Sequence, residues 1–147
     1  MISFTVPGYP ATKGSTRSFK HANTGQIVTV GDCEKLKDWE ARVALFARSA
    51  GAQASQDPIE IQVCFLLPRP KAHFRSNGAL KDTAPFFPAK KPDVDKMLRA
   101  ILDALTGVAY LDDCQVVWIC GKKLYATESR HVGAAIVMDV APRGSVL

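Results

Sequence analysis

One segment of the sequence, Pro92–Gly107, constrains the fold more than any other. Its large apolar residues recur at spacings of three and four, the period of one helix face, so they predict an amphipathic helix. Proline before the first turn and glycine after the last are typical of helix boundaries. The apolar stripe consists of Val94, Met97, Leu98, Ile101, Leu102 and Leu105. A helix with such a stripe needs an apolar surface to cover, which the rest of the chain has to supply.

Strand patterns in the sequence predict this surface. Apolar residues alternate with others along Ile2–Val6 and Ile59–Leu67, which indicates half-buried strands. Two more strands are expected at Gln115–Tyr125 and Val132–Val140, joined as a hairpin through Thr127–Arg130.

Two local elements precede the strand at 59–67. The stretch Ser15–Val30 is expected to form two strands around a turn at 23–25, where Asn, Thr and Gly follow one another. Asp32 then stands where a helix cap is expected, and the helix should run to about Ala50 and end at Gly51.

A long irregular segment, Pro68–Pro92, is rich in proline and basic residues, and segments of this length are often functional. Its basic residues are Arg69, Lys71, Arg75, Lys81, Lys90 and Lys91. Phe86 and Phe87 lie in it, and we expect them to anchor the loop to the body, with stacking on nucleic-acid bases as the alternative. Trp39 and Trp118 fit core faces of their elements.

The length suits one domain, 1–147, with a loose tail at 141–147. The net charge of +5 favours a polyanionic partner. No apolar run is long enough to span a bilayer and no signal-peptide pattern opens the chain, so a cytoplasmic protein with no membrane partner is expected. The cysteines form no C-x-x-C pair, so we expect free thiols, mostly buried in strands, and no structural zinc. They are Cys33, Cys64, Cys114 and Cys120.

Two pairs of acids flank the predicted helix. Asp93 and Asp95 stand at its start, and Asp112 and Asp113 stand in the turn after it. If the turn leads into a central strand, it can return Asp113 towards the first pair. Carboxylates gathered in this way repel one another unless a cation neutralises them, and hard oxygen ligands suit Mg²⁺ or Mn²⁺. The pattern therefore indicates a metal site for phosphodiester hydrolysis, with cations close by for a polyanionic substrate.

Each acid also has a structural explanation. Asp93 is a suitable helix cap, Asp95 a suitable first-turn acid, and Asp112 and Asp113 suit a turn. Arg99, four residues before Asp103, has the spacing of a helix-surface ion pair. Spacing alone leaves these alternatives open.

The run KKPDVDKMLRAILDALTGVAYLDDCQVV resembles the core of the RusA family of Holliday junction resolvases. Three ordered elements carry the resemblance: the D-x-D pair that opens the helix, a D-A-L segment within it, and a D-D-x-Q-V turn into a strand. The resemblance implies an α+β fold, a small mixed sheet with two main helices packed on it. It also implies a homodimeric, Mg²⁺-dependent endonuclease that cuts four-way DNA junctions symmetrically, with Asp93, Asp95 and Asp113 as metal ligands.

The chain departs from the family pattern at two positions. The family usually has asparagine directly after the second acid, where this chain has Lys96, and lysine four residues after that acid, where this chain has Arg99. Arginine can hold a phosphate but does not deprotonate, so proton transfer at Arg99 is in doubt. Lys96 either supplies the missing ammonium or crowds the metal.

Three functional hypotheses follow. In the first, a junction-resolving nuclease holds Mg²⁺, with Mn²⁺ as a substitute, on the three acids, while Lys96 and Arg99 stabilise the developing charge. No nucleotide cofactor is expected. In this hypothesis the DNA backbone is gripped by Lys71, Arg75, Lys90, Lys91, Lys122 and Lys123. The second hypothesis is a junction-binding protein without cleavage. The third is a phosphohydrolase for small substrates, which the lack of a glycine-rich phosphate cradle disfavours.

Overall fold

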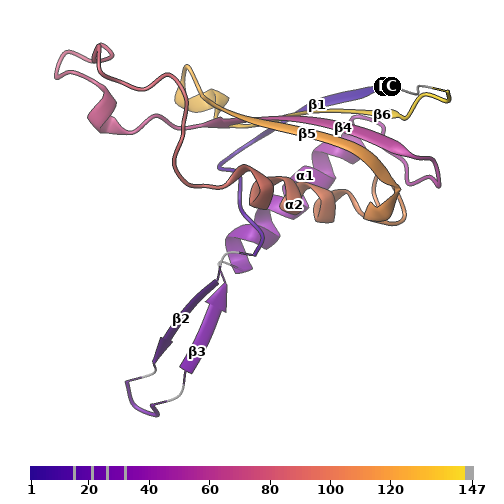
Figure 1. Cartoon of the computed structure of the whole chain (residues 1–147), viewed down its shortest axis with the longest axis horizontal. Helices are drawn as coiled ribbons and strands as arrows, with labels where there is room; N and C mark the ends of the chain where they lie inside the picture. Colours follow the sequence, from indigo (N-terminus) through magenta and orange to yellow (C-terminus); the bar gives the residue numbers. More distant parts are fainter. Residues whose placement is uncertain (15, 21, 26, 32, 145–147) are drawn as a thin grey trace.

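The computed structural model describes residues 1–14, 16–20, 22–25, 27–31 and 33–144. Among these residues, a four-stranded mixed sheet has the strand order β1-β6-β4-β5, and both long helices lie on one of its faces (Figure 1). The strands of this sheet are β1 (Ile2–Pro7), β4 (Ile59–Leu67), β5 (Val116–Tyr125) and β6 (Gly133–Val140). The helices are α1 (Cys33–Ser49) and α2 (Val94–Leu105). The expected α+β fold with a small mixed sheet and two helices is confirmed.

Strand β4 is one of the two interior strands of the sheet, and its alternation is regular along its whole length. Its residues Ile59, Ile61, Val63, Phe65 and Leu67 are all buried on the face that the helices cover. β4 pairs antiparallel with β6 along one edge and parallel with β5 along the other. Burying one side chain of this size is worth about 1.5–3 kcal/mol, so the alternation decides which face of the strand is buried.

The expected hairpin between β5 and β6 is wrong. The two strands are not neighbours in the sheet, because β4 lies between them and β6 pairs with β4 and β1. The connection passes the end of β4, where the Ala126 N–H donates to the Leu67 carbonyl over 2.8 Å, and includes the short 3₁₀ turn η3 (Ser129–His131). β5 is therefore an edge strand and not the central strand that was expected after the Asp113 turn.

The two helices pack on each other and on the sheet through the predicted apolar stripes. In α1, the buried residues include Trp39, Val43 and Ala47, and in α2 they include Met97 and Ile101. The helix ends agree with the sequence as well: α1 ends just before Gly51, whose φ of +96° suits glycine. Asp32, the expected cap of α1, lies outside the described residues.

Helix α2 lies close to the edge strand β5 because Gly121 has no side chain. A Cβ at Gly121 would stand 2.8 Å from the Leu98 side chain, closer than such atoms approach. This glycine therefore sets the distance between β5 and the helix that carries Asp95.

A second, two-stranded sheet consists of β2 (Thr16–Lys20) and β3 (Ile27–Gly31), and in Figure 1 it projects from the body that the main sheet and the helices form. Its strands agree with the two predicted within 15–30. Ser15 lies outside the described residues, whereas the residues of the predicted turn, 23–25, are described as exposed.

The segment 68–92 extends beyond the end of the main sheet and contains the short 3₁₀ turn η1 (Lys71–His73) (Figure 1). Its entry is fixed by Arg69, whose guanidinium lies 4.2 Å from the centre of the Tyr125 ring and donates to the Pro85 carbonyl over 2.8 Å. Phe86 and Phe87 do not anchor it: they are 76% and 57% exposed, and their rings contact each other edge to face.

Several smaller expectations are also settled. Trp39 is buried as expected, but Trp118 is 44% exposed because it pairs in register with Glu60, on the opposite face to the buried residues of β4. Cys114 and Cys120 are exposed free thiols and only Cys64 is partly buried, so most of the described thiols are not core residues. The side chain of Cys33 lies outside the described part of the chain. In the tail, the Ala141 N–H donates to Pro58, and 145–147 lie outside the described residues.

Candidate active site

The carboxylate of Asp93 stands at the start of α2 without acting as its cap. The Asp93 backbone is extended, with φ −75° and ψ 135°, and its carbonyl accepts the first helical hydrogen bond from Met97. Its side chain makes no capping hydrogen bond, however, and it lies 3.6 Å from the Lys96 ammonium. Asp95 is exposed in the first turn, where the positive end of the helix dipole favours acids. The capping explanation for Asp93 is therefore not supported by the side-chain contacts.

The backbone just before Asp93 is held by a lysine from the edge strand. The Lys123 ammonium donates to the carbonyls of Lys90 and Pro92, over 2.7 and 2.9 Å. Lys123 is paired in register with the buried Phe65, so the alternation along β5 points its side chain to the helix-covered face. This positioning contact was missed in the sequence, although the same alternation could have indicated it.

A second lysine that sequence reasoning missed ties the N-terminal segment to α2. The Lys13 N–H donates to the Lys96 carbonyl over 3.1 Å, and the Lys13 ammonium forms an ion pair with Asp103. The hydrogen bond to Asp103 is the main cause that raises the pKa of Lys13. The described salt bridge of Asp103 is therefore with Lys13. It is not with Arg99, the partner that the spacing on the helix had suggested. Arg99 is exposed beside Gly14.

At the other end of α2, Asp112 and Asp113 have different environments. The Asp112 carboxylate accepts a hydrogen bond from the Cys114 N–H over 3.0 Å. The Asp112 N–H in turn donates to the side-chain oxygen of Gln115, which completes a capping box. The bond from the Cys114 backbone is the main cause that lowers the pKa of Asp112. Asp113 opens the short 3₁₀ turn η2 (Asp113–Gln115) and is exposed. The turn explanation therefore holds for Asp112, while the exposed Asp113 side chain takes no part in the capping box and interacts with the neighbouring Asp112.

Asp113 lies beside the C-terminal half of α2. Tyr110, in the turn between them, donates from its hydroxyl to the Leu102 carbonyl over 2.7 Å. Burial is the main cause that raises the pKa of Tyr110, and the nearby charges of Asp113 and Asp103 raise it further. Asp113 therefore belongs to the end of the helix that is remote from Asp93 and Asp95.

Within one chain the three acids are not brought together. α2 has twelve residues, and a helix of that length is about 18 Å long. Among the described residues, no group of three or more His, Cys, Asp or Glu side chains is placed to hold a metal ion. The expectation that the turn returns Asp113 to Asp93 and Asp95 within the same chain is therefore wrong, because the turn leads into an edge strand that starts at the far end of α2.

Comparison with known proteins decides the family. The family model described as "Endodeoxyribonuclease RusA" matches residues 7–136. The chain belongs to the RusA family. It is also similar to a Bacillus subtilis (strain 168) protein named "Uncharacterized protein YqaN", with 32% identity over 132 residues, covering 88% of this chain and 91% of that protein. The chain is thus a member of an endodeoxyribonuclease family whose substrate is branched Holliday junction DNA.

The basic residues expected to contact DNA in this RusA-family chain have unequal freedom to do so. Lys71, Lys90, Lys91 and Lys122 are exposed. Arg75 is exposed too, but it forms an ion pair with Asp82 over 3.1 Å. Lys123 is only half exposed, and its ammonium is engaged with two carbonyl groups. The described contacts of Lys123 are thus with the backbone before Asp93, and its expected contact with DNA stays a prediction.

The three candidate carboxylates suit Mg²⁺ chemically, but they lie at different ends of α2. Asp93, Asp95 and Asp113 offer carboxylate oxygens, the ligands that Mg²⁺ prefers, and in the described structure none of the three carboxylates serves as a cap. Each end of α2 offers only part of the set.

No helix among the described residues has the length and apolar character to cross a membrane.

Proposed function

We propose that this chain is a Mg²⁺-dependent, structure-specific endodeoxyribonuclease that acts as a homodimer and resolves four-way DNA junctions by paired, symmetric phosphodiester hydrolysis. Mn²⁺ should substitute for Mg²⁺. Its role is in DNA recombination and repair. The observation that carries the proposal is that the Asp93 carboxylate of this RusA-family chain makes no capping hydrogen bond and lies next to Asp95 and 3.6 Å from the Lys96 ammonium.

The division of the acids between the two ends of α2 supports the homodimer. Two antiparallel α2 helices related by a two-fold axis bring the start of each helix beside the end of the other. Asp93 and Asp95 of one copy then meet Asp113 of the second copy, and the two sites that result are equivalent. Paired incisions on two strands need two equivalent sites, so the same symmetry serves both the ligand set and the product.

The residues of the site divide the work. Asp93, Asp95 and Asp113 would hold the metal, which when bound lowers the pKa of a water molecule and neutralises charge on the phosphate. Arg99, exposed one turn after Asp95, is placed to hold a phosphate oxygen and to stabilise negative charge. Lys123 fixes the backbone before Asp93 so that its carboxylate stays in position.

The proposal also includes contacts between the exposed lysines and the DNA backbone. Lys90 and Lys91 directly precede the acids, and Lys71 lies in the extended segment 68–92, while Lys122 lies on the sheet face opposite the helices. Lysine contacts to phosphates position DNA without selecting its sequence. Their contribution should therefore weaken as the salt concentration rises.

A second candidate, a junction-binding protein without cleavage, is favoured by one observation. The Lys96 ammonium lies 3.6 Å from Asp93 and occupies the neighbourhood in which a metal ion would bind. A cation already placed there competes with Mg²⁺ for the same carboxylate. The test below separates the two candidates.

The test compares a synthetic four-way junction with a linear duplex of the same sequence in Mg²⁺, Mn²⁺ and EDTA. Wild type should make paired, metal-dependent nicks on the junction alone. Asp95→Asn and Asp113→Asn should still bind the junction but should not cut it. Tight binding of the junction by wild type with no cleavage in either metal would contradict the nuclease and support the binding protein.

A further inference from the structure

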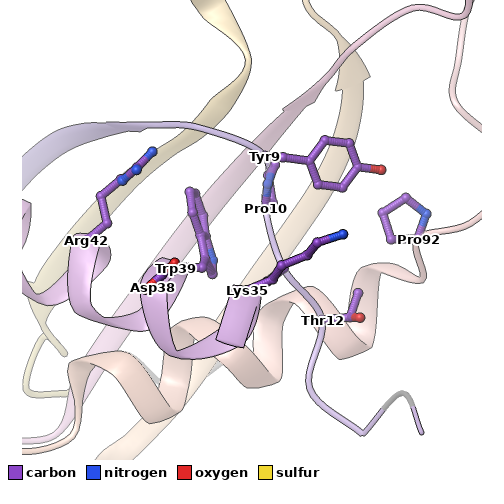
Figure 2. A pocket seen from close by; sticks show the side chains of 9 residues that line it. Tyr9, Pro10, Thr12, Lys35, Asp38, Trp39, Arg42 and Pro92 are labelled. Carbon is purple, nitrogen blue, oxygen red and sulfur yellow. The ribbon is translucent and has the colours of Figure 1, made fainter. Parts of the chain in front are cut away.

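A pocket of about 380 Å³ lies between the N-terminal half of α1, the segment after β1 and the residue before Asp93 (Figure 2). Its apolar walls include Tyr9, Pro10, Trp39 and Pro92. The volume falls within the range of about 300–1,000 Å³ that is usual for small-molecule sites. None of the roles proposed above uses this pocket.

Trp39 forms one apolar wall of the pocket and is itself almost completely buried. Its side chain is 3% exposed, and the indole N–H is buried without a hydrogen-bond partner among the described residues. Because this nitrogen has almost no accessible surface, it does not open into the pocket. The pocket offers a ligand only the apolar surface of this side chain.

The mouth of the pocket combines an exposed aromatic ring with positive charge. Tyr9 is 58% exposed, although it lies directly before the fully buried Pro10. Figure 2 shows the Tyr9 ring and the Lys35 side chain extending in the same direction, towards Pro92. An exposed ring of this kind is a stacking platform for a flat aromatic group, and the ammonium suits an adjoining phosphate. Together with the apolar walls of the pocket, these features fit a nucleotide.

The position of the pocket connects it with the acids. Pro92 is both a pocket wall and the neighbour of Asp93. The segment that carries Tyr9 is tied to the first turn of α2, because the Lys13 N–H donates to the Lys96 carbonyl. A DNA strand with its phosphate at Asp93 therefore passes within reach of the pocket.

We propose that this pocket receives one unstacked nucleobase of the junction, next to the phosphate that is cut. This inference rests on the proposed function. The base stacks on Tyr9, packs against the apolar walls of the pocket, and its own phosphate lies against Lys35. A base that is already unpaired costs less to extrude than a base within a continuous duplex. The pocket thus favours branched DNA in which such a base stands next to the cut, and gives the cleavage its sequence preference.

The test is a double-mutant cycle between the protein and the DNA. Junctions with a single abasic site at each position near the crossover are bound to the Asp95→Asn protein, which cannot cut, and to Asp95→Asn with Tyr9→Ala. At one position the abasic site should weaken binding by about tenfold, in line with base–aromatic stacking. Tyr9→Ala should cause a similar loss, and at that position the abasic site should then add nothing. Independent losses at every position would overturn the proposal.

Matched variants separate stacking from general effects. Tyr9→Phe keeps the ring and should behave as the parent protein. Lys35→Ala should weaken binding, whereas Lys37→Ala, an exposed lysine of the same helix that does not line the pocket, should not. Equal losses for the two lysine variants would contradict a phosphate contact at Lys35.

Two further results distinguish the possible failures. If deoxynucleoside monophosphates occupy the pocket at low concentration while no abasic position is coupled to Tyr9, the pocket serves free nucleotides and the proposal fails. If wild type cleaves junctions without this coupling, the proposed nuclease function is supported and the base-binding role of the pocket is refuted. If the coupling is found but wild type does not cleave, the base-binding role is supported and the nuclease function is refuted. A lack of junction binding overturns both.

Discussion

The two ends of helix α2 both carry a pair of acids, and the two pairs are held in different ways. At the start, the Asp93 side chain makes no capping hydrogen bond and lies near Lys96. The Lys123 ammonium holds the backbone that precedes it. After the end, Asp112 is bound into a capping box, and the exposed Asp113 side chain lies outside that box, beside Asp112. The first end thus offers two carboxylates with cations around them, and the second end offers one.

This difference shows that α2 keeps the two pairs of acids apart and does not bring them together. Met97, Ile101 and Leu105 are fully buried along its length, so it is fixed on the sheet and on α1. Neither end has a complete ligand set, and the ends stay about 18 Å apart. Under the proposed function, each end is completed by the opposite end of a second copy.

The largest expected effect comes from mixing two inactive variants. Asp95→Asn and Asp113→Asn homodimers should both be inactive. A mixed dimer with one chain of each should regain one intact site, because the undamaged start of one helix meets the undamaged Asp113 of the other chain. Differently tagged chains, co-expressed and purified as the heterodimer, should therefore nick one strand of a junction without completing its resolution.

The control for this experiment mixes Asp93→Asn with Asp95→Asn. Both changes lie at the same end of α2, so every site in that heterodimer lacks one ligand and no activity should return. If the Asp95→Asn and Asp113→Asn mixture also stays inactive while it still binds the junction, the shared site is wrong and each chain must form its site alone.

The second prediction separates the two adjacent acids after α2. Asp113→Asn should lower cleavage by more than about 100-fold, since loss of even a contact behind a metal ligand costs about 10–100-fold. Asp112→Asn should leave cleavage nearly unchanged and lower Tm slightly, because the Asp112 carboxylate serves the capping box. Junction cleavage and thermal unfolding of the two variants measure this directly. A comparable loss of cleavage in both would assign a catalytic contribution to Asp112 as well.

Regular periodicity predicted the elements that pack on the core. β1, β4, α1 and α2 each bury one face, so their alternation or helical spacing appears in the sequence and gives bounds close to those found. The D-x-D pair at the start of α2 was located in the same way, because the helix pattern fixes where its first turn lies.

Strand partners and edge positions were not predictable in this way. β5 and β6 follow each other in the chain, and periodicity does not show that β4 takes the place between them. The same limitation explains Trp118: alternation places it on one of two faces, but the helices cover only the other. The position of Asp113 depends on this sheet order, so the division of the acids was not visible in the sequence.

The third prediction tests how the first end is held in place. Lys123→Met keeps the length of the side chain but removes the ammonium that binds the carbonyls of Lys90 and Pro92. We expect the Mg²⁺ concentration for half-maximal cleavage to rise by about tenfold, as for other contacts that orient metal ligands. Junction affinity measured in EDTA should change little.

Lys122→Met is the matched control for that experiment. Lys122 is the exposed neighbour of Lys123 on the same strand, with its side chain on the opposite face. Its loss should reduce junction affinity and the salt dependence of binding without altering the Mg²⁺ requirement. If both variants change only DNA affinity, Lys123 is a DNA contact and its positioning role is refuted.

The smallest expected effect concerns the cation that stands beside Asp93. Lys96→Asn removes the ammonium that lies 3.6 Å from Asp93 and introduces the asparagine of the family pattern described in the sequence analysis. Exposed ion pairs on a helix are worth about 0.2–0.5 kcal/mol, so removal of this competitor should lower the half-maximal Mg²⁺ concentration by only about twofold. The change should be larger at low salt, where such pairs are less screened. A fall in the cleavage rate at saturating Mg²⁺ would instead assign Lys96 to the stabilisation of charge on the phosphate, because competition for Asp93 disappears once the metal saturates the site.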